Sequence, residues 1–152
     1  MRLTRQSNYA IRALVYCAIN DPGLSRVADI AKAYGISELF LFKLIKPLVE
    51  GGLIQTVRGR HGGIKLGRPA KDISLLETIR LTEENFALAE CFEDGADCPL
   101  IGECDLNSAL REALGAFFAV LDGYSIADLA QKRRSLRERL GLKFVEPIAL
   151  AH

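Results

Sequence analysis

The pattern that most restricts the fold is LIQTVRGRHGGIKL, residues 53–66, in which two short strand-like runs flank the glycine-rich segment RGRHGG. Three segments with a helical spacing of apolar residues precede it. The order is therefore one helix, then two helices joined by a glycine turn, then a two-stranded hairpin. A three-helix core with an incidental hairpin has the same order. The side chains of Arg58, Arg60 and His61 at the hairpin tip favour the layout of a winged helix–turn–helix instead.

Turn and capping residues set the boundaries of the three helices. The first helix ends at Asp21-Pro22-Gly23, a sequence that stops helices. Ser25 is expected to cap the second helix, Gly35 turns the chain, and Ser37 is expected to cap the third helix, ELFLFKLIKPLVE. Pro47 lies late in that third helix, where we expect a kink or an early end.

Charge is distributed unevenly along the 152 residues, although the formal net charge is only +1. Residues 1–72 hold twelve Lys and Arg against five Asp and Glu, a net charge of +7. Residues 73–152 hold eight against fourteen, a net charge of −6. A basic half joined to an acidic half indicates a polyanionic partner for the first half, with chance clustering as the alternative.

The second half of the chain predicts helices of a different kind. Residues 72–86, DISLLETIRLTEENF, indicate a short helix that Ser74 opens. From Asn107 a long amphipathic helix, NSALREALGAFFAVLDGY, carries an apolar stripe too wide for a lone exposed helix. It must pack on the winged domain or on a second copy, and a homodimer suits a protein that reads two half-sites. The stripe consists of Leu110, Leu114, Phe117, Phe118 and Leu121.

The expected fold class is mainly α with a small two-stranded β-wing, a winged helix–turn–helix followed by a long dimerisation helix. The expected organisation is a DNA-binding domain over 1–72, a linker helix and cysteine segment over 73–105, a dimerisation helix and C-terminal helix over 106–140, and a tail over 141–152. No run approaches the roughly 20 apolar residues that cross a bilayer, and the N-terminus lacks a signal-peptide pattern. We therefore expect a cytoplasmic protein with no membrane partner.

The four cysteines fall into two groups. Cys17 lies among apolar residues of the first helix, where a buried free thiol is expected. Cys91, Cys98 and Cys104 lie within fourteen positions of an acidic, glycine-containing segment, AECFEDGADCPLIGEC. A reducing compartment disfavours disulfides, and the spacing lacks the close cysteine pairs of structural zinc sites. Three thiolates of one segment can hold an iron–sulfur cluster, while a thiol redox switch, a zinc ion and inert thiols remain alternatives.

Several stretches also resemble a known family. MRLTRQSNYAIRAL, ADIAKAYGIS, GGLIQTVRGRHGGIKLGRPA and the three-cysteine segment are together similar to the Rrf2 family of winged-helix regulators, over about residues 1–140. The resemblance implies a homodimer that binds palindromic promoter sites on double-stranded DNA and senses through an iron–sulfur cluster. Within the family, SELFLFKLIKPL and the segment 80–121 are most similar to the RirA branch of iron-responsive repressors, with the IscR and NsrR branches more distant.

Two departures from the family pattern concern the fourth iron ligand. The resemblance places Asn107 where the IscR branch has a histidine. It places Asn8 where some nitric-oxide-sensing members take an acidic ligand from the partner subunit. Both amides are poor candidates for a fourth ligand. The resemblance therefore implies a 4Fe-4S cluster rather than a 2Fe-2S cluster on the three cysteines, with one labile iron held by solvent or a small molecule.

The resemblance assigns base reading to the third helix through Leu39, Phe40 and Lys43. Lys43 would donate to guanine, and Leu39 or Phe40 would touch a thymine methyl group, with core burial as the alternative for these two apolar residues. On the wing, Arg58 and Arg60 would lie at the minor groove. The remaining expected DNA contacts lie at the two helix starts or on the wing: Arg2, Thr4, Arg5, Ser37, His61, Gly62 and Gly63.

The resemblance implies a transcriptional repressor that responds to iron, and also to oxygen or nitric oxide. A thiol–disulfide sensor on the same scaffold is one alternative. An iron–sulfur carrier or electron-transfer protein is another, but it has no need of a basic first half. Two poorly placed histidines and scattered acidic residues form no catalytic constellation. We therefore expect neither enzymatic activity nor a small-molecule substrate.

Overall fold

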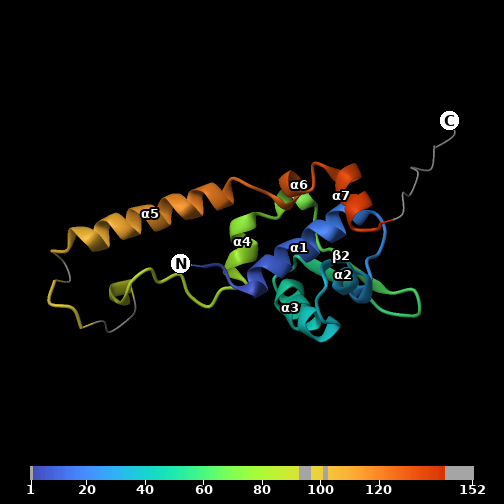
Figure 1. Ribbon diagram of the computed structural model, residues 1–152, viewed down its shortest axis with the longest axis horizontal. Coiled ribbons are helices and arrows are strands. Elements are labelled where there is room, and N and C mark those ends of the chain that lie inside the picture. The colour runs from blue at the N-terminus through green and yellow to red at the C-terminus, as the bar shows by residue number, and fades with distance from the viewer. Residues whose placement is uncertain (1, 93–96, 101–102, 143–152) are drawn as a thin grey trace.

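The computed structural model describes residues 2–92, 97–100 and 103–142. Figure 1 shows a cluster of helices beside a small hairpin, and one long helix that projects from them. The expected fold class, mainly α with a two-stranded wing, is confirmed. The elements are α1 (Arg5–Asn20), α2 (Val27–Tyr34), α3 (Glu38–Glu50), β1 (Ile54–Val57), β2 (Gly63–Leu66), η1 (Ala70–Asp72), α4 (Leu75–Arg80), η2 (Glu90–Phe92), α5 (Asp105–Asp122), α6 (Ile126–Leu129) and α7 (Arg133–Arg139).

The first five elements form the winged helix–turn–helix around α1. Helix α1 contacts α3, β2, α4, α6 and α7, so its buried side chains lie at the centre of the core. Strands β1 and β2 are antiparallel, with Ile54 opposite Leu66 and Val57 opposite Gly63. Ile54 and Ile64 are buried while most other strand residues are exposed or half-buried, so one face of the hairpin packs on the helices.

Ser25 does not cap α2, contrary to the expectation from sequence. The N-cap residue is Arg26, which makes no side-chain capping bond. The backbone N–H of Ser25 instead donates to the carbonyl oxygen of Ile64 at 2.9 Å, and its own carbonyl oxygen accepts from the N–H of Ile64 at 2.8 Å. These two bonds place the α1–α2 connection along β2 as a one-residue third strand.

The predicted boundaries at Gly35 and Ser37 are confirmed, whereas the early end expected at Pro47 is not found. Gly35 ends α2 in the left-handed conformation, with φ of 64°, which glycine adopts without strain. The hydroxyl of Ser37 caps α3 by accepting the N–H of Phe40 at 3.1 Å. Pro47 does not end α3 early, because the helix continues to Glu50.

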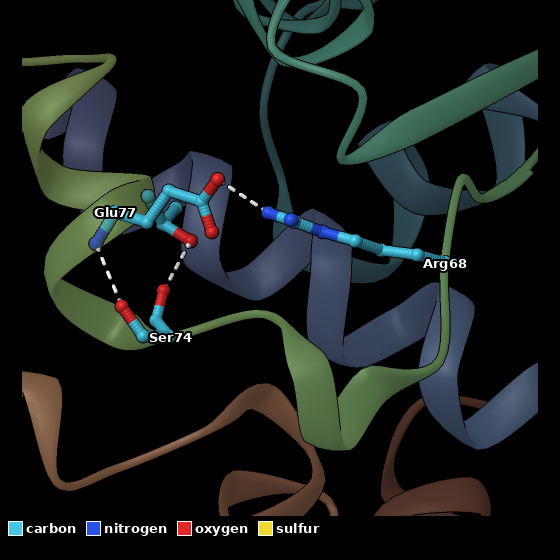
Figure 2. Close-up of polar contacts among 4 residues, drawn as sticks. Arg68, Ser74 and Glu77 are labelled. Atoms are coloured by element: carbon cyan, nitrogen blue, oxygen red, sulfur yellow. Dashed lines mark hydrogen bonds and ion pairs between the residues drawn. The ribbon is translucent and has the colours of Figure 1, made fainter.

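Helix α4 is joined to the end of the wing by polar contacts (Figure 2). Ser74 caps α4 as predicted, accepting the N–H of Glu77 at 3.0 Å, and the hydroxyl of Thr78 donates to the Ser74 carbonyl oxygen at 3.1 Å. The Glu77 carboxylate forms an ion pair with the guanidinium of Arg68, just after β2. Such a half-exposed pair contributes little energy.

Helices α6 and α7 return to α1 and pack on the winged domain. Ile126 is buried in the core, and its N–H donates to the carbonyl oxygen of Ile73 at 2.9 Å. The guanidinium groups of Arg133 and Arg137 both donate to the carbonyl oxygen of Ile19 near the end of α1, at 3.0 and 2.6 Å. Cations in this position bind the carbonyl groups at a helix C-terminus and interact favourably with its dipole.

Helix α5 projects away from the other helices (Figure 1), and none of its described side chains is buried. On one side the predicted apolar stripe is half-buried, and Phe118 meets Phe86 edge-on with ring centroids 4.9 Å apart. A second apolar stripe, spaced alternately three and four residues apart, is exposed; it consists of Leu106, Ala109, Ala113, Ala116 and Val120. Over the residues that the structure describes, no helix combines the length and apolar character that crossing a bilayer requires.

Candidate nucleic-acid interface and cysteine segment

Helix α3 buries one face and exposes a continuous stripe on the other. Leu41, Leu44, Ile45 and Leu48 are buried in the core. The exposed stripe is Leu39, Phe42, Lys43 and Lys46, at the i, i+3, i+4, i+7 spacing of one helix face, with Leu39 71% and Phe42 55% exposed. Two large apolar side chains beside two lysines at the start of a helix form a surface suited to the base edges of a DNA groove.

The structure places Phe42, rather than Phe40, beside Leu39 and Lys43. Phe40 is half-buried, with its ring edge-on to that of Tyr9 at 5.9 Å between centroids. Phe42 did not emerge from the sequence analysis as a DNA contact. Its helical spacing from Leu39 carried the signal, because residues three apart in a helix share a face.

The wing presents three of the predicted residues at its tip and uses the other two within the hairpin. Arg58, Arg60 and His61 are exposed. A Cβ atom on Gly62 would lie 2.2 Å from the carbonyl oxygen of Val57, so the turn itself requires glycine there. A Cβ atom on Gly63 would lie 2.7 Å from the Ser25 carbonyl oxygen, so the close approach of Ser25 to β2 requires glycine there.

The starts of α1 and α3 meet around one cleft of about 610 Å³. It brings together three of the residues expected to contact phosphate, Thr4, Arg5 and Ser37, whereas Arg2 is exposed outside it. The hydroxyls of Thr4 and Ser37 accept helix N–H groups, so they serve as caps. The N-terminus of α3 and the Arg5 guanidinium make the cleft favourable for an anion. Its full lining is Thr4, Arg5, Gln6, Gly35, Ile36, Ser37 and Phe40.

A carboxylate from the second half of the chain lies at the start of α1. The Glu83 carboxylate accepts the N–H of Thr4 at 2.8 Å, the hydroxyl of Thr4 at 3.1 Å and the hydroxyl of Ser7. The buried Ser7 hydroxyl also lies 2.7 Å from that of Thr82. Desolvation raises the pKa of Glu83, but the hydrogen bonds from Ser7 and Thr4 together hold it below the ordinary value. Sequence reasoning missed Glu83, because no local pattern marks a partner 79 positions away.

The four thiols are all free, and they differ in burial. Cys17 is buried as predicted, and that burial raises the pKa of its thiol to about 12. Cys91, Cys98 and Cys104 are half-buried. Across residues 2–92, 97–100 and 103–142, no three His, Cys, Asp or Glu side chains lie close enough together to hold a metal ion. The three cysteines are therefore on one segment but are not gathered into a site.

Two of the cysteines are joined to the start of α5. Cys104 is the N-cap residue of α5, and its carbonyl oxygen accepts the N–H of Asn107 at 3.1 Å. The side-chain amide of Asn107 donates to the Sγ of Cys91 at 3.1 Å. Asn8, the other candidate for a fourth ligand, is exposed on α1. The three thiols are ligands of the type that iron–sulfur clusters require. They are free and partly shielded from solvent, and one of them accepts a hydrogen bond.

Comparison with known proteins places these features in a family. The profile of Rrf2, described as "Iron-dependent Transcriptional regulator", matches residues 3–132. The chain is 56% identical to the protein aau3 of Rhizobium meliloti strain 1021, over 97% of this chain and 96% of that one. It is 44% identical to the HTH-type transcriptional regulator NsrR of Geobacillus kaustophilus, over 92% and 97% of the two chains.

Solved structures of two regulators are similar in fold. T. potens IscR is 25% identical, with a TM-score of 0.72 over 90% of this chain and 91% of that one. CymR, the global cysteine regulator of B. subtilis, is 27% identical, with a TM-score of 0.69 over 86% and 97% of the two chains. Because the two scores are so close, the shape of the chain does not by itself identify the signal that it senses.

Proposed function

The chain belongs to the Rrf2 family of transcriptional regulators, and on that premise we propose that it is a homodimeric, iron-responsive repressor of the RirA type. It acts in the cytoplasm on a palindromic promoter operator and senses iron through a cluster held by Cys91, Cys98 and Cys104. Membership of this family makes it a DNA-binding regulator and not an enzyme. The observation that carries the iron-sensing part is the position of three free thiols between a basic DNA-binding head and a long helix with one exposed apolar face.

The operator contacts come from three surfaces. The exposed stripe of α3 enters the major groove, with Lys43 as the hydrogen-bond donor to a base. Arg58 and Arg60 at the wing tip lie at the minor groove, and the cleft at the starts of α1 and α3 holds a phosphate. The net charge of +7 on residues 1–72 supports this assignment, because phosphate neutralisation supplies much of the affinity for DNA.

The homodimer forms along the exposed stripe of α5. Its alternating three- and four-residue spacing is that of a helix that packs against a second helix. The alanines at its centre, Ala109, Ala113 and Ala116, allow two helix backbones to approach closely, while Leu106 and Val120 cover the ends. Dimerisation would bury the apolar surface that a single chain leaves in water.

Cys91, Cys98 and Cys104 supply thiolate ligands, and a 4Fe-4S cluster with one exchangeable iron would make the site sensitive to iron supply. Glu83 lies eight residues before Cys91 and bonds to the start of α1, which lines the phosphate cleft. A rearrangement of the cysteine segment would therefore reach the DNA-binding face through Glu83. We expect iron-loaded protein to bind the operator and iron-free protein, including protein exposed to oxygen or nitric oxide, to release it.

Anaerobic purification followed by absorption spectroscopy and native mass spectrometry tests the cofactor and the dimer together. The expected result is a coloured dimer with up to four irons per chain, lost in Cys→Ala variants of the three ligands and kept in Cys17→Ala. A gel shift then compares loaded and iron-free protein on promoter fragments. Equal affinity of the two forms for the operator would contradict the direction of control.

A thiol–disulfide sensor is the second candidate, favoured by the three free thiols that are not gathered into a site. Among the similar solved structures is an oxidised form of Staphylococcus aureus CymR. This candidate requires a colourless protein whose operator binding follows dithiothreitol rather than iron. Iron bound at substoichiometric levels after anaerobic reconstitution, together with reversible disulfide formation, would favour it over the cluster.

A further inference from the structure

We infer that Asn107 is a hydrogen-bond donor to the sulfur of Cys91, held in this orientation by Arg111, and that it positions this cysteine rather than binding iron itself. The inference rests on the proposed function, because it concerns a proposed iron ligand. The Nδ2 atom of Asn107 lies 3.1 Å from Cys91 Sγ. The Nε atom of Arg111 lies 2.8 Å from Asn107 Oδ1, so the amide is engaged at both ends.

The contact with Arg111 decides which way the Asn107 amide points. The guanidinium of arginine has only donors, so the amide atom facing it must be the carbonyl oxygen. The amide nitrogen then faces Cys91, where sulfur is the acceptor. If the Asn107 amide were flipped, its NH2 group would face the Nε–H group of Arg111, which is also a donor. The Cys91 sulfur would then face the amide oxygen. The orientation therefore follows from donor and acceptor chemistry.

Arg111 is itself fixed against the segment that carries Cys91. Its guanidinium lies over the ring of Phe92, 4.8 Å from the centroid. Asn107 and Arg111 are one turn apart on α5, while Cys91 and Phe92 are neighbours in η2. Two adjacent contacts thus join η2 to the first turns of α5, where Cys104 is the N-cap. This arrangement holds Cys91 near the same helix end as Cys104.

The engaged amide leaves Asn107 without a free oxygen for iron. A hydrogen bond to a ligand sulfur stabilises negative charge on that sulfur and so favours the reduced state of a bound cluster. Asn107→Ala should therefore retain the wild-type iron content and have a more negative reduction potential. We expect about a tenfold change in the one-electron reduction equilibrium, equal to ~59 mV.

The experiment compares the full-length, anaerobically loaded dimer with its variants by native mass spectrometry and by spectroelectrochemical titration. Ser108→Ala is the matched control, since Ser108 is exposed on the same turn of α5 and its side chain makes no described contact. Loss of iron, or a change in the iron count, in Asn107→Ala but not in Ser108→Ala would contradict the expected retention of iron and overturn the inference.

Arg111→Ala provides a readout that a merely structural role would not move. If Arg111 acts through Asn107, its loss shifts the potential in the same direction by a smaller amount. The double variant should then equal Asn107→Ala alone, because the second change has nothing further to remove. Additive shifts from the two changes would mean that Arg111 acts independently, and this part of the inference would be wrong.

The contact is also tested without iron, so that failure of the cluster proposal does not decide the question. In nitrogen-15 spectra of the iron-free protein, the side-chain amide signals of Asn107 are those that disappear in Asn107→Ala. They should move in Cys91→Ala and stay in Cys98→Ala. Signals unmoved by Cys91→Ala would refute the hydrogen bond even if the wild-type protein carries a full cluster.

Discussion

The backbone N–H of Thr4 donates to a carboxylate oxygen of Glu83 at 2.8 Å, so the first turn of α1 begins on a residue from the second half of the chain. The hydroxyls of Thr4 and Ser7 donate to the same oxygen. A carboxylate at a helix N-terminus is stabilised by the N–H groups there and by the helix dipole. The segment that leads to the cysteines is thereby attached to the edge of the cleft at the starts of α1 and α3.

Glu83→Gln is expected to lower the free energy of unfolding by about 1 kcal/mol at neutral pH, because it removes the charge from these hydrogen bonds. The pKa of Glu83 is lower in the folded protein than its ordinary value of 4.5. A carboxyl group with a depressed folded-state pKa contributes stability above its unfolded-state pKa and loses it as the pH falls through the folded-state pKa.

Urea unfolding of wild type and Glu83→Gln across pH measures this contribution. The difference between them should be constant above the ordinary carboxyl pKa and shrink as the pH falls below 4.5. Glu84→Gln is the control, since Glu84 is the exposed neighbour. A difference that is as large under strongly acidic conditions as at neutral pH would show that the charge is not responsible.

Phe42→Ala and Phe40→Ala should separate DNA contact from packing. Phe42 is exposed, so its truncation should leave stability nearly unchanged and weaken operator binding by roughly tenfold. Phe40 packs on Tyr9, so its truncation should lower the unfolding free energy by about 1–2 kcal/mol. Operators with deoxyuridine in place of thymine lack the methyl group, so wild type should bind them more weakly. Phe42→Ala should bind the two operators with equal affinity. A variant that still discriminates the two operators would exclude Phe42 as the methyl contact.

Arg58→Ala should weaken binding to specific and non-specific DNA alike. Loss of one phosphate contact lowers the slope of log affinity against log salt by about 0.9. Lys132→Ala removes the same charge at the N-cap of α7, which packs on α1 outside the wing, and should leave the slope unchanged. DNA-binding titrations at several salt concentrations give the slope of log affinity against log salt for each variant. Equal slopes for Arg58→Ala and wild type would place the wing away from DNA.

Val120→Asp should convert the dimer to a monomer, since it puts a charge in the exposed stripe of α5. Val120 is 61% exposed in the single chain, so the monomer should keep its fold. Sedimentation velocity measures the mass, and circular dichroism checks helix content. Ser108→Asp lies off the stripe and serves as the control. A dimer that persists in Val120→Asp would require a different interface.

Local signals predicted most of the fold, and long-range contacts account for what they missed. Gly35, Ser37 and Ser74 act within a few residues of their own position, so turn and capping rules identified them. Ser25 is also a serine just before a helix, but it forms a β-bridge with Ile64, 39 positions on, instead of a cap. No local rule distinguishes a serine that caps a helix from one that forms such a bridge. The contacts of Arg133 and Arg137 with Ile19 are likewise invisible in sequence.

In the candidate site, too, local signals predicted some residues, and others depended on their surroundings in the fold. The family resemblance pointed to Lys43 and Leu39, which are exposed on α3, and the acidic segment with its cysteines was recognisable from composition. In the structure Phe42 is exposed and Phe40 is half-buried. The sequence LFLF, with two phenylalanines two positions apart, could not tell which of them is exposed. The role of Asn107 depended on Arg111 and Cys91 together, since an amide is equally plausible as a ligand and as a donor until its partners are known.

The junction at the C-terminal end of α5 has a consequence for the proposed spacing of operator half-sites. Ser74 and Ser125 form an antiparallel bridge, and the N–H of Leu75 donates to the carbonyl oxygen of Tyr124 at 2.8 Å. The end of α5 is thus clamped to the start of α4, whose cap is tied to the wing through Arg68 and Glu77. In a dimer built on α5, the angle at this clamp sets how far apart two α3 helices stand, and consecutive major grooves on one DNA face recur only every ~34 Å. In such a dimer, a change of tilt at Ser74 and Ser125 would change the separation of the two α3 helices and so their fit to successive major grooves.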